Sequence, residues 1–179
     1  MSSLRSLRHT PAVGIDKEKS EVSMIQVSAP VGAVRKSSAM QAIAVGGLVG
    51  GSLDLLQACI KFGWDIPLAI AGGVLGKKAF GGGPGTYILG VLLHYFIATT
   101  AAATYYAASR RLTYLRESWV VCGLFFGAAV DTFMRLVVLP LSALHGRGPY
   151  EWKDLVMGLV AHSIVIGLPI AFCVRRFGN

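Results

Sequence analysis

The chain has 179 residues and a formal net charge of +8, yet only 15% of its residues are charged and 54% are hydrophobic. This composition, with a mean hydropathy of +0.59, excludes an ordinary soluble domain of this length. It indicates a membrane protein.

The first 38 residues differ from the rest because they are polar, rich in serine and mixed in charge, as in the run DKEK at 16–19. Such a segment buries too little apolar surface to fold, so residues 1–38 are predicted to form a disordered cytoplasmic tail. A secretory signal is not expected, since the first apolar run begins late and contains Asp54. The opening MSSLRSLRHT is also typical of an organellar transit peptide, which leaves an organellar inner membrane as an alternative location.

Four apolar stretches follow, and they predict membrane-spanning helices at 39–60, 87–107, 119–141 and 155–174. Each has about 20 residues, enough to cross a hydrocarbon core roughly 30 Å thick. The predicted fold class is therefore all-α, with a four-helix transmembrane domain over residues 39–176.

The distribution of basic residues predicts the orientation. Eleven of the seventeen Lys and Arg residues lie in the tail, in the loop 110–116 and at 175–176, and four spans place these three segments on one side. The positive-inside rule then puts both termini in the cytoplasm, across a bacterial inner membrane. This topology explains the positive charge, so the lipid bilayer is the expected partner and nucleic acid is not.

The loop 63–86 contains an apolar run, 68–75, that is too short to span, followed by the glycine-rich segment GKKAFGGGPG. Runs of this length are usually interfacial or re-entrant. We expect a short interfacial helix that caps the bundle in this first outer loop, with a re-entrant segment as the alternative.

Each apolar stretch carries an ionisable residue near its middle: Asp54, His94, Asp131 and His162 in chain order. Such groups are costly in lipid, by roughly 2.5–3.5 kcal/mol on insertion scales, so they need partners or a function. Counted from the span ends, all four fall at a similar depth, which predicts an intramembrane polar layer. Arg135 lies four residues after Asp131 and is expected to pair with it on one helix face.

The two halves of the membrane domain repeat a pattern. Gly47 and Gly51 precede Asp54, as Gly123 and Gly127 precede Asp131 one residue further on, and G-x-x-x-H recurs in the second and fourth spans. Two helical hairpins of the same orientation, related by an axis along the membrane normal, are therefore predicted. Small residues at these positions let helix backbones approach closely. The predicted helix-packing residues are Gly47, Gly51, Gly90, Gly123, Gly127 and Gly158.

Several short motifs together resemble a group of small bacterial four-span inner-membrane proteins. They are the glycine run before Asp54, KAFGG at 78–82, LLHYFIAT at 92–99, SRR at 109–111, VVLPLSA at 137–143 and GLVAH at 158–162. The resemblance covers residues 42–176 and implies a four-span inner-membrane topology. It transfers no catalytic or ligand-binding residue.

The sequence favours a structural or accessory membrane subunit over an enzyme. It lacks HExxH, GxSxG and clustered acidic motifs, and its three cysteines (Cys59, Cys122 and Cys173) are unclustered, so no catalytic residue, metal site, disulfide or cofactor is predicted. The GxxxG faces also suit a homo-oligomer or a larger membrane complex. The alternative is a small proton-linked transporter or permeation protein that uses the Asp/His layer, since such pairs serve proton-coupled carriers. Two Asp and two His residues are also potential transition-metal ligands, although their spacing gives no chelate signature.

Overall fold

The computed structural model describes residues 31–146 and 148–178, with side chains from residue 38 onward. Contacts divide the chain into the units Met1–Val34 and Arg35–Asn179, and the four membrane-length helices all lie in the second. Every regular element in the described part of the chain is helical. Helix α2 begins at Val31, so the end of the predicted tail is helical, and residues 1–30 lie outside the described residues.

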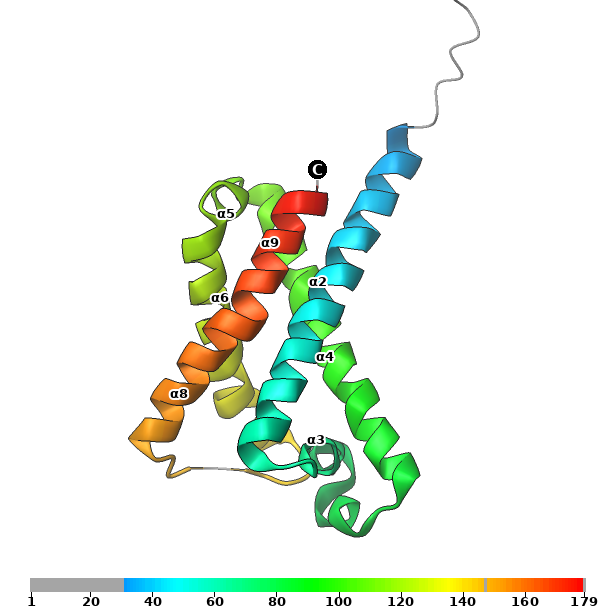
Figure 1. The fold of residues 1–179 in the computed structure, drawn as a ribbon, viewed down its shortest axis with the longest axis vertical. Coiled ribbons are helices and arrows are strands. Elements are labelled where there is room, and N and C mark those ends of the chain that lie inside the picture. The colour runs from blue at the N-terminus through cyan, green and yellow to red at the C-terminus, as the bar shows by residue number, and fades with distance from the viewer. Residues whose placement is uncertain (1–30, 147, 179) are drawn as a thin grey trace, which may run out of the picture. The chain divides into compact units, whose positions relative to one another are not determined.

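Four helices are long and apolar enough to cross a membrane: Ser38–Phe62, Pro84–Arg111, Trp119–Leu141 and Trp152–Phe177. These match the four apolar helices that the sequence predicts and extend three of them by a few residues. Figure 1 shows α2 and the α8–α9 helix beside each other, with the end of α4, helix α5 and the C-terminal residues at one end of this unit. The helix α3 lies at the opposite end.

The first span is part of α2 (Val31–Phe62), and the second is α4 (Pro84–Arg111), which begins with a proline where no backbone donor is needed. Between them lie α3 (Ile66–Leu75) and a short 3-10 segment, η1 (Gly76–Gly81). A helix is thus present in the first loop, as predicted. It packs on α4 through Gly90, where a Cβ atom would meet the backbone oxygen of Pro67.

The third and fourth spans are each interrupted by a π-helical turn. The third consists of α6 (Trp119–Phe133), η2 (Met134–Val138) and α7 (Leu139–Leu141), and the fourth of α8 (Trp152–His162), η3 (Ser163–Gly167) and α9 (Leu168–Phe177). A proline follows each π turn, at 140 and 169. Because proline lacks the N–H that an α-helix needs there, the local change of hydrogen-bond pattern has a clear cause.

The tightly packed core lies toward the end of the unit that carries α5 (Tyr114–Glu117). Tyr105 is buried there, and its hydroxyl donates to the Leu115 backbone oxygen at 2.8 Å. The buried cluster contains mostly small and branched residues, which allow close helix approach in lipid: Ala42, Ala102, Tyr105, Cys122, Ile166, Ile170, Ala171 and Val174. The other half of the bundle is looser and contains the candidate site.

Candidate functional site

The five residues of the predicted polar layer come together around one cavity of about 340 Å³. They come from four different spans: Asp54, His94, Asp131, Arg135 and His162. The cavity lining also includes Lys61 and Phe62, the last residues of α2, so the cavity extends to the α3 end of the bundle. The arrangement is a charged pocket within an apolar bundle.

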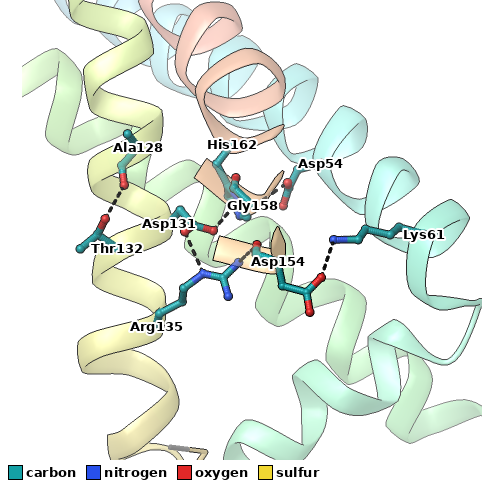
Figure 2. Close-up of polar contacts among 9 residues, drawn as sticks. All are labelled: Asp54, Lys61, Ala128, Asp131, Thr132, Arg135, Asp154, Gly158 and His162. Carbon is teal, nitrogen blue, oxygen red and sulfur yellow. Dashed lines mark hydrogen bonds and ion pairs between the residues drawn. The ribbon is translucent and has the colours of Figure 1, made fainter. Parts of the chain in front are cut away.

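Asp131 is the centre of the network and is almost fully buried, with a side chain 3% exposed. Its Oδ2 atom accepts a hydrogen bond from Arg135 Nε at 2.8 Å, which confirms the pair predicted from their spacing. Its Oδ1 atom lies 3.1 Å from His162 Nδ1 on the facing helix. Figure 2 shows Asp131 between these two partners. The buried carboxylate is therefore paired on both of its oxygens.

His162 connects Asp131 to Asp54. Its Nδ1 atom lies 3.0 Å from the Gly158 carbonyl oxygen as well as close to Asp131. Because both neighbours are acceptors, Nδ1 carries the proton and donates to them. The other nitrogen, Nε2, lies 3.7 Å from Asp54 Oδ1. A neutral ring would direct a lone pair toward this carboxylate, so the Nε2–Oδ1 pair is a place where one proton is stabilised.

The structure brings Asp54 close to His162 of the fourth span, whereas His94 of the second span bonds elsewhere. His94 Nε2 lies 2.7 Å from the Gly51 carbonyl oxygen and donates to it. The adjacent Tyr95 hydroxyl lies 2.8 Å from Ser52 Oγ, so a second polar contact joins α4 to α2 at this level. His94 therefore holds α2 against α4 and still lines the cavity.

Two charged residues extend the network toward the α3 end of the bundle, and the sequence reasoning did not select them for the site. Arg135 donates through a terminal nitrogen to the Asp154 backbone oxygen at 3.2 Å, and Lys61 Nζ lies 3.6 Å from Asp154 Oδ1. Figure 2 shows both contacts converging on Asp154. A signal was present, since Lys61 ends one span and Asp154 begins another at the same side of the membrane.

The six predicted packing glycines each lie where another part of the bundle approaches closely. Gly47 and Gly51 leave room for α4, where an added Cβ atom would lie 2.6 Å from Thr99 and 2.9 Å from Ala98. Gly123 and Gly127 do the same for the fourth span, facing the backbone oxygens of Gly167 and His162. Gly90 makes room for α3, as described above.

Gly158 lies where α8 approaches polar side chains of the third span. An added Cβ atom there would meet the Arg135 guanidinium, and it would lie 2.8 Å from Asp131 Oδ1. The absence of a side chain at Gly158 thus creates the space in which the Asp131–Arg135 pair lies against α8.

Among the residues that the structure describes, no three His, Cys, Asp or Glu side chains form a metal-binding group. The arrangement places two carboxylates and a histidine side by side in a cavity, a combination that can exchange protons and contact a polar group. Comparisons of the chain with protein-family models, with curated proteins and with solved structures found no match.

Proposed function

We propose that this integral membrane protein is a small proton-linked transporter whose binding site is the Asp/His cavity. The observation that carries the proposal is the cavity of about 340 Å³, which is lined by Asp54, Asp131 and His162 and reaches one end of the bundle. Charged groups inside a membrane are costly and mark ion or substrate pathways when they face a cavity. A layer used only for packing needs no such space beside its charged groups.

The arrangement as two parallel hairpins is part of the proposal, and the glycine contacts support it. Gly47 faces Thr99 and Gly123 faces Gly167, and these partners each lie five residues after the histidine of their span. Gly51 and Gly127 likewise face residues within one turn of the histidines. Transporters built from repeats typically bind substrate near the membrane midplane between the repeats.

The π-helical turns offer a second, independent support. One begins three residues after Asp131 and the other directly after His162. Single π-helical turns are rare and frequently occur at functional sites, because they alter the direction of neighbouring side chains. Both turns therefore lie where a transport site would need adjustable geometry.

We propose that α3 is the interfacial helix of the first outer loop. α3 contacts α4 through Pro67. Trp64 before α3 and Lys77 and Lys78 after it are exposed. Aromatic and basic residues in such positions anchor a segment at the membrane surface. α3 would then border the mouth of the cavity, since Ile66 and Ile70 belong to the cavity lining.

A structural or accessory role is the second candidate, and the pairing of Asp131 favours it. Both oxygens of this carboxylate are already engaged, and the contacts of Asp131 with His162 and of Arg135 with the Asp154 backbone hold the third span against α8 without needing a ligand. In this case the protein would stabilise a homo-oligomer or a larger membrane complex and would have no catalytic activity. The two candidates differ in whether water reaches Asp54.

We further propose that the protein resides in a bacterial inner membrane with both termini in the cytoplasm. A reporter fused after Asn179 should be fluorescent as a cytoplasmic protein and inactive as periplasmic alkaline phosphatase, because the basic residues follow the positive-inside rule. A fusion within the loop after Leu141 should give the opposite pattern. An active phosphatase at the C-terminus would contradict this orientation.

Hydration of the cavity is the decisive test of the transport proposal. Ala58 lines the cavity one turn after Asp54, whereas Leu56, nearer the middle of the same span, is 50% exposed on the bundle surface that would face lipid. In a background without Cys59, Cys122 and Cys173, an Ala58→Cys thiol should react with a charged, membrane-impermeant methanethiosulfonate in intact membranes. The matched Leu56→Cys thiol should not, because the thiolate does not form in lipid.

The side of addition supplies a further control. Labelling of the Ala58→Cys thiol should be fast from the side on which Lys61 lies and slow from the other. If both thiols remain unlabelled in folded protein, the cavity is dry, the transport proposal is wrong and the structural role stands.

A further inference from the structure

An apolar groove lies beside the polar cavity, between α4 and the third span. It has a volume of about 530 Å³, and its walls include Phe96, Thr100, Phe126 and Phe133. Phe96 is 68% exposed and Phe133 is 57% exposed, so the groove opens on the surface of the bundle that the bilayer would cover. A molecule in the membrane therefore has direct access to it.

The groove and the polar cavity share a wall. Ile97, Ala101, Val130 and Met134 line both of them. These side chains are apolar, so no charged group separates the two spaces. A single molecule that occupies both spaces would therefore meet only apolar side chains where it passes between them.

The groove itself contains no polar group that needs a hydrogen-bond partner from a ligand. The hydroxyl of Thr100 donates to the Phe96 backbone oxygen at 2.7 Å, and that of Thr104 donates to the Thr100 oxygen at 2.9 Å. Both hydroxyls are thus satisfied within their own helix, and the remaining walls are hydrocarbon or aromatic. The groove is suited to an alkyl or aryl group.

The polar part of a ligand for this cavity is determined by the charged groups that have no close partner in the protein. Among the cations of the cavity, Arg135 is bound to Asp131 and to the Asp154 backbone, and Lys61 is paired with Asp154. Asp54 has only the long contact of 3.7 Å to His162. A carboxylate whose one partner is at this distance has free lone pairs, which suit a ligand that donates N–H hydrogen bonds and carries positive charge.

We infer that the cavity binds a lipophilic amine, whose ammonium group contacts Asp54 and whose apolar part lies in the groove between α4 and the third span. The inference rests on the proposed transport function and names its substrate class. The titratable groups that face Asp54 are His162, His94 and Asp131. A cationic head group would compete with the proton held between Asp54 and His162, which links binding of the amine to release of that proton.

Binding to the full chain in phosphatidylcholine nanodiscs tests this inference directly. Tritiated decylamine should bind saturably above empty nanodiscs, and unlabelled decylamine should compete far better than either decanoate or methylamine. Asp54→Asn should weaken binding by about tenfold or more, since a hydrogen bond to a charged group contributes on this scale. The control Asp65→Asn removes an exposed carboxylate before α3 and should have no effect.

The groove is tested separately from the head group. Ala101→Leu narrows the shared wall and should weaken decylamine binding, and Thr100→Phe should do so from an exposed position that does not disturb the core. Ala107→Leu makes the same change on an exposed face of α4 outside the groove and should bind normally.

Each result has a defined meaning. Equal binding of decanoate, or unchanged binding by Asp54→Asn, would overturn the assignment of a cationic head group. Equal competition by methylamine, or normal binding by both groove variants, would overturn the role of the groove. If the Ala58→Cys thiol is labelled and decylamine does not bind, the substrate class is wrong while the hydrated transport site remains.

Discussion

Replacing Arg135 with leucine should lower the free energy of unfolding by about 3–5 kcal/mol, because a buried ion pair that loses one partner leaves an uncompensated charge. The Asp131 side chain is 3% exposed, so its carboxylate would lose the guanidinium at a position with little access to solvent. Because His162 remains near the other carboxylate oxygen, we expect a loss of stability toward the lower end of this range. Equilibrium unfolding in mixed micelles, followed by circular dichroism, measures the change.

The double variant Asp131→Leu/Arg135→Leu should be more stable than Arg135→Leu alone. It removes both charges together, and apolar replacements of buried pairs are often close to neutral. Arg111→Leu is the matched control, since it removes an exposed arginine at the end of α4 and should change stability little. Strictly additive losses from the two single changes would show that Asp131 and Arg135 do not act as a pair.

Leucine at Gly127 should destabilise the protein more than leucine at any other glycine of the first or third span. A Cβ atom at Gly127 would meet the His162 backbone oxygen, and it would lie 2.5 Å from the Ser163 Cα atom, so neither neighbour can rotate away. We expect a loss of more than about 3 kcal/mol, beyond the usual range for overpacking. Gly51→Leu should cost less, because its nearest neighbours are the side chains of Ala98 and Tyr95.

Gly83→Leu is the control for this series, since nothing lies within 4 Å of a Cβ atom at that position. The fraction of monodisperse protein that survives heating in detergent, measured by size-exclusion chromatography, ranks the variants. Similar losses at Gly127, Gly51 and Gly83 would show that backbone contact at the glycines does not determine stability.

The spans and their approximate ends were predictable because hydropathy and length are local properties of the sequence. The Asp131–Arg135 pair was predictable for the same reason, since residues four apart on a helix are neighbours. The partner of Asp54 was not predictable from the sequence in this way. Its choice of His162 over His94 depends on how far α2 and α8 rotate about their axes, which the side chains between them determine together.

The cavity and the π-helical turns were not predicted either. Pro140 and Pro169 were visible signals for the turns, but proline in a membrane helix is also compatible with a simple kink. The cavity is the space that the surrounding side chains together leave unfilled, so no single residue predicts it. Lys61 and Asp154 were missed because each looks, by itself, like an ordinary charge at a span end.

The one-residue difference between the halves, with Asp131 four residues after its glycine and Asp54 three after its own, alters the symmetry of the site. One residue turns a helical side chain by about 100°. A duplicated bundle with equal spacing would place each carboxylate alike relative to its own histidine and would create two equal centres. Here both carboxylates face His162, while His94 bonds to backbone. The polar layer therefore has one shared centre, with one histidine that lies near both acids.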